Sequence, residues 1–129
     1  EKVFAKKINK KMRTKALYTV LSQKFRDKEI LFVDSISFSA PKTSVAQSML
    51  KTLSVSAQLP MLAKKSKNAA LLATYNDSSN SNTEKSFNNI ESVTVGALQN
   101  INPVEVLRHK YLIITNPELA IAFLAKKSL

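Results

Sequence analysis

The residues of this sequence best equipped for chemistry form a cluster of cations near its start. Positions 6 to 15 hold six Lys or Arg side chains and no Asp or Glu. Ammonium and guanidinium groups donate hydrogen bonds to phosphate oxygens and neutralise their charge, so a dense cationic run favours contact with a polyanion. A solvated charged face is the competing interpretation, but like charges four residues apart destabilise an isolated helix. The cations are Lys6, Lys7, Lys10, Lys11, Arg13 and Lys15.

The excess of positive charge is concentrated rather than spread along the chain. The 129 residues carry 20 Lys or Arg and 9 Asp or Glu, which gives a formal net charge of +11. Residues 1–28 hold ten of these cations against two acidic residues. Charge placed for solubility alone would be spread evenly, so this pattern predicts a localised contact with a polyanionic partner.

Several classes of protein are excluded by what the sequence lacks. The absence of Cys removes disulfides, thiol catalysis and Cys–zinc sites. A single glycine, Gly96, removes every phosphate-binding loop that is built on several glycines. No run approaches the roughly 20 apolar residues of a membrane-spanning helix, and the polar, Lys-rich start lacks the apolar stretch of a signal peptide. We therefore expect no membrane association and a cytoplasmic location.

His109 is the one histidine and the remaining candidate for catalysis. A Ser–His–acid arrangement would need an acid and a hydroxyl beside it, and the nearby candidates are only Glu105 and Thr115. Nine scattered carboxylates and one imidazole show no metal-ligand spacing. Flanked by Arg108 and Lys110, His109 is expected to serve local structure or to contact a phosphate. The sequence thus predicts that the chain is not an enzyme and holds neither a metal nor a cofactor.

A helix over residues 6–25 is expected to present the cationic cluster. The segment contains no Gly or Pro and is rich in strong helix formers. We expect its C-terminal half to dock on the core while its N-terminal half projects a basic surface. The predicted apolar stripe consists of Ile8, Met12, Ala16 and Val20, widened in the second half by Leu17, Leu21 and Phe25.

The rest of the chain, residues 29–127, alternates between predicted strands and helices. Strands that are apolar on both faces and separated by helices favour a parallel sheet covered on both sides. We therefore predict a single α/β domain over residues 1–129, with a three-layer α/β/α fold and a mostly parallel four-stranded sheet. Asn102 is the expected N-cap of one helix. The expected strands are 29–34, 69–75, 92–95 and 110–115, and the expected helices are 41–53, 84–88, one that begins at 102–105, and 116–127.

The polar and basic segments between these elements and at the end of the chain are predicted to contribute little or nothing to binding. Residues 76–83 are predicted to form a low-complexity polar loop, and the basic cluster at 64–67 lies in a linker as a second, weaker patch. Lys126 and Lys127 end the last helix, whose dipole favours cations there, so no role in binding a polyanion is assigned to them.

The carboxyl ends of the predicted strands carry polar residues, and ligands bind at such ends in doubly wound sheets. Asp34 could take the place of an acidic ribose-binding residue, but the glycine-rich turn that would hold a pyrophosphate is missing. Loop polarity explains these positions, so we predict no small-molecule substrate. Tyr18, Phe25 and Phe32 could stack on bases, but their positions favour the core. The strand-end segments are Asp34–Ser35, Tyr75–Asp77 and Thr115–Asn116.

Seven segments spread over the chain agree, in the same order, with one known family. They are Lys6–Arg13, Ala16–Ser22, Ile30–Asp34, Pro41–Thr43, Lys85–Ile90, Asn102–His109 and Leu112–Thr115. Together they resemble the bacterial large-subunit ribosomal protein of the fourth family. Ordered agreement of several segments over essentially the whole chain is more specific than any one motif.

The resemblance implies an α/β domain that binds large-subunit ribosomal RNA as a structural protein, beside neighbouring ribosomal proteins in the ribosome. Arg108 and His109 match the Leu-Arg-His segment of the family, for which phosphate contact and local structure both remain open. Carried over by position, the residues that would contact RNA phosphates are Lys7, Asn9, Lys10, Lys11 and Arg13.

Two parts of the family pattern have no counterpart in this sequence. They are an N-terminal portion and a long extended loop that reaches the peptide exit tunnel. We therefore expect the chain to correspond to the C-terminal part of the globular domain, and the resemblance assigns no tunnel-lining role to its residues.

Three functions from different classes compete at this stage. A structural, ribosomal RNA-binding module is the leading hypothesis, because the charge map and the resemblance indicate the same residues. The alternative is an RNA-acting enzyme on an α/β scaffold that resembles nucleotide-binding proteins, although it lacks a glycine loop, a nucleophile–base pair and a metal set. A binder of anionic lipids is the third, and the mixed, partly buried character of the first helix disfavours it.

Overall fold

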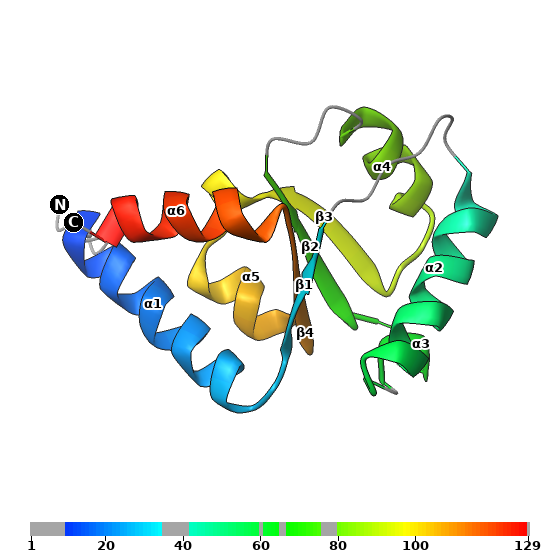
Figure 1. The fold of residues 1–129 in the computed structure, drawn as a ribbon, viewed down its shortest axis with the longest axis horizontal. Helices are drawn as coiled ribbons and strands as arrows, with labels where there is room; N and C mark the ends of the chain where they lie inside the picture. The colour runs from blue at the N-terminus through cyan, green and yellow to red at the C-terminus, as the bar shows by residue number, and fades with distance from the viewer. Residues whose placement is uncertain (1–9, 35–41, 60, 65–66, 76–79, 129) are drawn as a thin grey trace, which may run out of the picture.

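The computed structural model describes residues 10–34, 42–59, 61–64, 67–75 and 80–128. Within these residues, helices flank a four-stranded sheet on both faces (Figure 1). All strand pairs are parallel, and the strand order is β1-β4-β2-β3. The predicted three-layer α/β/α fold is confirmed, with a sheet that is wholly parallel. The strands are β1 (Ile30–Val33), β2 (Ala70–Thr74), β3 (Val93–Ala97) and β4 (Tyr111–Thr115).

The central position of β2 and β4 in the sheet explains why their sequences are apolar without alternation. Every residue of β2 and β4 is buried, whereas β1 and β3 at the sheet edges are partly exposed. Successive side chains of a strand point to opposite faces of the sheet. Leu112 and Ile114 of β4 therefore join one core, and Ile113 joins the other.

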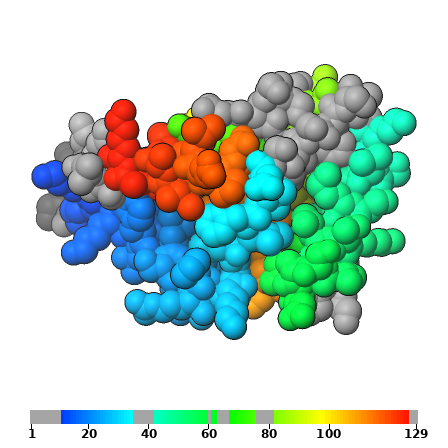
Figure 2. Space-filling view, in the orientation of Figure 1, coloured from blue at the N-terminus to red at the C-terminus, as the bar shows by residue number. Residues whose placement is uncertain are grey.

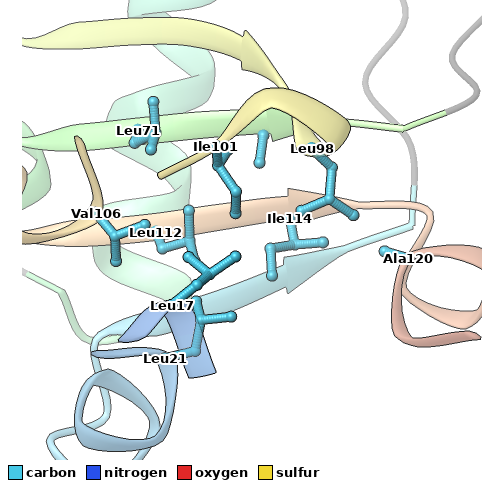
Figure 3. Close-up of a cluster of buried hydrophobic side chains, with 10 residues drawn as sticks. Leu17, Leu21, Leu71, Leu98, Ile101, Val106, Leu112, Ile114 and Ala120 are labelled. Atoms are coloured by element: carbon cyan, nitrogen blue, oxygen red, sulfur yellow. The ribbon is translucent and has the colours of Figure 1, made fainter. Parts of the chain in front are cut away.

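Each face of the sheet has its own helices and its own hydrophobic core. The helices α2, α3 and α4 cover one face, and α1, α5 and α6 cover the other. Figure 3 shows the second core, in which Leu17 and Leu21 of α1 lie against Leu112 and Ile114 of β4. The helices are α1 (Lys10–Arg26), α2 (Thr43–Ser56), α3 (Met61–Lys64), α4 (Asn80–Phe87), α5 (Pro103–Arg108) and α6 (Pro117–Ser128).

The strand order shows how the chain winds. From β1 the chain crosses through α2 and α3 to β2, and then moves outward through α4 to β3, all on one face. It returns from β3 to β4 through α5 on the opposite face. The chain reverses its direction across the sheet and changes face at the same point. All of its crossovers therefore have the same handedness, as is usual for parallel β–α–β units. The strand β4 thereby separates β1 from β2.

The apolar stripe predicted for the first helix is displaced in the structure. The C-terminal half of α1 does dock on the core, through Leu17 and Leu21. Met12 and Ala16, which the stripe also included, are exposed. The first turns of α1 extend past the sheet toward the end of α6 (Figure 1), so no core lies beneath them.

The expectation that Phe25 and Phe32 belong to the core is wrong. Phe25 is 67% exposed, and Phe32 lies on the edge strand β1 and is 40% exposed. Together with Ile121 of α6, they border an apolar groove of about 420 Å³ beside β1. Figure 2 shows β1 at the surface, between α1, α6 and the side formed by α2 and α3. An apolar run identifies a strand, but it does not tell which strand will form the edge of the sheet.

Among the short helices and turns, the local sequence pattern predicted some features and missed others. The N-cap at Asn102 is confirmed, because its Oδ1 accepts a hydrogen bond from the backbone N–H of Glu105 at 2.9 Å. The short helix α3 and the 3₁₀ turn η1 (Leu98–Asn100) were not predicted. The helix α4 begins at Asn80, inside the predicted polar loop, and residues 76–79 of that loop lie outside the described residues.

The contrast between Leu17 and Phe25 gives a stability test on one helix. Leu17 is 3% exposed, so Leu17→Ala should lower the free energy of unfolding by about 2–5 kcal/mol through lost burial and a residual cavity. Phe25→Ala should change it by no more than ~0.5 kcal/mol, because the ring is largely in solvent already. Urea denaturation followed by circular dichroism measures both values. Equal losses for the two variants would show that the Phe25 ring is packed.

Candidate nucleic-acid interface

The position of α1 is fixed by a buried ammonium group near its C-terminal end. Lys24 is only 8% exposed. Its Nζ donates hydrogen bonds to the backbone oxygens of His109 at 2.6 Å and of Lys110 at 2.9 Å. The carboxylate of Glu29 lies 3.5 Å away and supplies the counter-charge. A buried cation is costly unless it is paired and hydrogen-bonded, so these contacts fix where α1 leaves the sheet.

Glu29 holds a second cation at this same edge of the sheet. The Nζ of Lys110 lies 2.6 Å from its Oε2. The hydrogen bond and the negative charge of Glu29 raise the pKa of Lys110 above its ordinary value. Lys24 belongs to the basic first quarter of the sequence, but the structure uses its charge within the fold. Only part of the cationic excess near the start of the chain is therefore available to a partner.

The exposed cations of α1 lie on its first half. We call Lys11, Arg13 and Lys15, which are all exposed, the basic surface. A helix turns about 100° per residue, so Lys11 and Lys15 lie on nearly the same side and Arg13 lies on the opposite one. Among the described residues, neither Arg13 nor Lys15 forms an ion pair with a carboxylate. The predicted projection of cations from this half of the helix is thus present in the described turns.

The side chains of four further residues of the predicted site are not described by the structure. Lys6, Lys7 and Asn9 lie outside the described residues. Lys10 is described only as the first residue of α1. Their contacts with a polyanion remain predictions.

The end of α6, which carries a further cation, lies beside the start of α1. The last turns of α6 lie beside the first turns of α1 (Figure 1). The hydroxyl of Tyr18 donates a hydrogen bond to the backbone oxygen of Leu124, and burial raises the pKa of that hydroxyl. Lys126 follows two residues later and is exposed. The sequence explained Lys126 by a helix dipole alone, because no local pattern indicates that the first and last helices are neighbours.

His109 is held inside the fold. It is 2% exposed, its Nδ1 lies 2.8 Å from the backbone oxygen of Glu105, and its Nε2 lies 3.1 Å from Oγ1 of Thr94. A neutral ring satisfies both contacts by donating from Nδ1 and accepting at Nε2. Of its two open roles, this geometry supports local structure. Arg108 is exposed, and its Nη1 pairs with Oε1 of Glu105 at 3.1 Å.

The polar residues at the strand carboxyl ends bond mainly to one another. The backbone N–H of Tyr75 donates to Oγ1 of Thr115 at 3.2 Å, and the side-chain amide of Asn116 donates to the backbone oxygen of Tyr75. The backbone N–H of Asn116 lies 3.1 Å from the backbone oxygen of Asp34. Three strands are fastened together at the place where a doubly wound sheet would hold a ligand. Asn76 and Asp77 lie outside the described residues.

The described ranges hold neither a metal-binding cluster nor a membrane-spanning helix. Among these residues, no group of three or more His, Asp or Glu side chains is placed to hold a metal ion. None of the described helices is both long and apolar enough to cross a bilayer.

A wholly parallel sheet between two helical layers makes the described part of the chain a three-layer α/β protein, and exposed cations project from its first helix. A family model described as "Ribosomal protein L4/L1 family" matches residues 1–124. The chain belongs to this family, which confirms the resemblance inferred from the ordered segments. The family consists of structural ribosomal proteins, in agreement with the expectation that the chain is not an enzyme.

Curated relatives agree with the family match. The large ribosomal subunit protein uL4 of Clostridium beijerinckii is 34% identical over 108 residues, which cover 84% of this chain and 46% of the relative. The large ribosomal subunit protein uL4 of Oceanobacillus iheyensis is 33% identical over 113 residues, which cover 87% of this chain and 48% of the relative. The chain therefore spans about half the length of the relatives it matches.

The anchor of α1 can be tested by removing the charge of Glu29. Glu29→Gln should lower the free energy of unfolding at pH 7 by about 1–3 kcal/mol, because Lys24 then stays buried without its counter-charge. Chemical denaturation measures the loss. Glu105→Gln is the matched control, since it breaks an exposed ion pair, and its effect should stay below ~1 kcal/mol. Similar losses for the two variants would contradict the anchoring role.

Glu29→Gln should also change how the free energy of unfolding depends on alkaline pH. The pKa of Lys110 is higher in the folded chain than in the unfolded chain, so its proton stabilises the folded state. That contribution is complete below the unfolded value of about 10.4 and is lost as the pH rises through the folded value. The parent chain should therefore lose stability more steeply than Glu29→Gln above about pH 10. Parallel stability curves for the two proteins would refute the coupling.

Proposed function

We propose that this chain is a structural, RNA-binding part of the large ribosomal subunit, and that the basic surface of α1 contacts the phosphate backbone of ribosomal RNA. Lys6, Lys7, Asn9 and Lys10 continue the contact toward the start of the chain. Arg108 and Lys126 are further candidates for phosphate contact, and His109 is left out because its ring is buried and bonded. Ribosomal RNA and neighbouring ribosomal proteins are its partners, and the ribosome is its location.

One observation carries this proposal more than any other. The run at positions 6–15 holds six Lys or Arg residues and no Asp or Glu, and Arg13 and Lys15 project from it without an ion pair to any described carboxylate. A phosphate backbone offers counter-charges to such cations in a regular array.

The competing functions lack comparable support. An RNA-acting enzyme on this scaffold would use the strand carboxyl ends, where Tyr75, Thr115 and Asn116 bond to one another. A binder of anionic lipids would present an apolar helix face beside its cations. In α1, Lys11 and Lys15 lie on one side and Arg13 on the opposite side, and the apolar Leu17 and Leu21 are buried in the core.

The salt dependence of RNA binding tests the proposal. Log affinity for transcripts of large-subunit ribosomal RNA should fall linearly with log salt concentration, by roughly 0.7–0.9 units for each phosphate neutralised. The triple variant Lys11→Glu, Arg13→Glu, Lys15→Glu should bind far more weakly and reduce that slope by about two to three units. Filter binding over a range of KCl concentrations gives both quantities. A flat salt dependence of the parent chain would end the proposal.

A matched variant separates a positioned surface from total charge. Lys42→Glu, Lys51→Glu, Lys85→Glu changes the net charge equally at exposed positions next to or within α2 and α4, on the opposite helical layer. It should retain most of the affinity. If it weakens binding as much as the α1 triple does, the basic surface is not the contact.

A further inference from the structure

A groove with mixed polar and apolar walls lies next to the basic surface. It has a volume of about 340 Å³, and it runs between the first half of α1 and the connection from η1 into α5. That size falls in the range of about 300–1,000 Å³ typical of small-ligand sites. Arg13 lines it from α1, and Gln99, Asn100 and Asn102 line it from the connection. We call it the Arg13 groove.

The described polar side chains of the Arg13 groove are its guanidinium, the carboxamides of Gln99, Asn100 and Asn102, and the hydroxyl of Thr14. No Asp or Glu is among the described residues that line it. Gln99 and Asn100 are exposed, and their side chains form no hydrogen bond within the described part of the chain. Asn102 uses its Oδ1 to cap α5, which leaves its Nδ2 donor for another partner. The groove therefore offers both donors and acceptors beside one cation.

Part of the lining of the Arg13 groove is apolar. Leu17 and Ile101 line it, and both belong to the core cluster in Figure 3. Pro103 adds a ring at the start of α5. A flat ligand placed here would cover apolar surface with its face while its edge met the carboxamides.

This combination matches an unpaired nucleobase better than a phosphate alone. A phosphate only accepts hydrogen bonds, so it would use the N–H donors of Gln99 and Asn100 but not their carboxamide oxygens. A base edge carries donors and acceptors together, and Asn and Gln pair with such edges. Proteins read RNA sequence mainly at unpaired nucleotides, whose bases are free to leave the helix. The guanidinium of Arg13 can hold the adjoining phosphate or stack on the base.

We propose that an unpaired nucleotide of the bound RNA sits in the Arg13 groove, with its base edge on the carboxamides of Gln99 and Asn100 and its phosphate on Arg13. This inference rests on the proposed RNA-binding function. It adds a contact that depends on the identity of a base to a surface that otherwise meets only phosphates. The two contacts therefore respond differently to salt and to mutation.

The test compares two surface double variants in binding to transcripts of large-subunit ribosomal RNA. Gln99→Ala, Asn100→Ala should weaken binding about tenfold and leave the log–log salt slope unchanged, since it removes base contacts and no phosphate contact. Gln47→Ala, Asn88→Ala removes two exposed carboxamides from the opposite layer and should leave the affinity unchanged. Arg13→Gln should lower the slope by about one unit.

Chemical probing of the same RNA locates the contact. Reagents that methylate the Watson–Crick edges of unpaired bases should show one base protected by the parent chain and exposed again with Gln99→Ala, Asn100→Ala. If the double variant keeps both the base protection and the affinity of the parent chain, no nucleotide binds in the Arg13 groove. A loss of binding to a neighbouring ribosomal protein in this variant would not rescue the proposal. If the parent chain itself bound RNA without salt dependence, the proposed function would fail first, so the two failures are distinguishable.

Discussion

The ammonium of Lys24 is the contact on which the arrangement of the proposed interface depends. It joins the end of α1 to the backbone just before β4, and Glu29 at the start of β1 balances its charge. A helix docked by apolar contacts alone could slide or rotate at modest cost, but a buried cation keeps its hydrogen bonds only in one position. Because this anchor lies near the C-terminal end of α1, the first turns of the helix reach beyond the sheet. There Arg13 and the connection into α5 line a common groove.

The sequence predicted those features of the fold that depend on neighbours along the chain. Unbroken apolar runs identified the buried strands, and Asn102 followed by Pro103 identified a helix start. It did not predict features that depend on which elements become neighbours in space. Phe32 looked like core because the run that contains it is apolar, yet β1 is an edge. The same limit applied to the end of α6, which carries Lys126 and lies beside the first turns of α1 only once the sheet has placed the last helix there.

The candidate site shows a similar division. Counting charges was enough to locate the cations of α1, because their excess is local in sequence. Counting could not separate Lys24, which serves the fold, from Arg13 and Lys15, which face outward. The Arg13 groove was beyond prediction, since Asn100 is distant from Arg13 along the chain and ordinary in type. Only the packing of α1 against α5 and the turn before it creates the groove.

No other described strand pairs with the outer edge of β1, and this has a consequence for the chain when it is alone in solution. In the parallel ladder with β4, the oxygens of Glu29 and Val33 accept hydrogen bonds, so Ile30 and Phe32 direct their backbone groups outward. Such an edge beside exposed aromatic rings is a template for a second strand. The net charge of +11 makes two copies repel one another, and at physiological salt this repulsion acts over about 8 Å. The same charge thus acts as a colloidal barrier: dilute salt preserves it, and concentrated salt removes it.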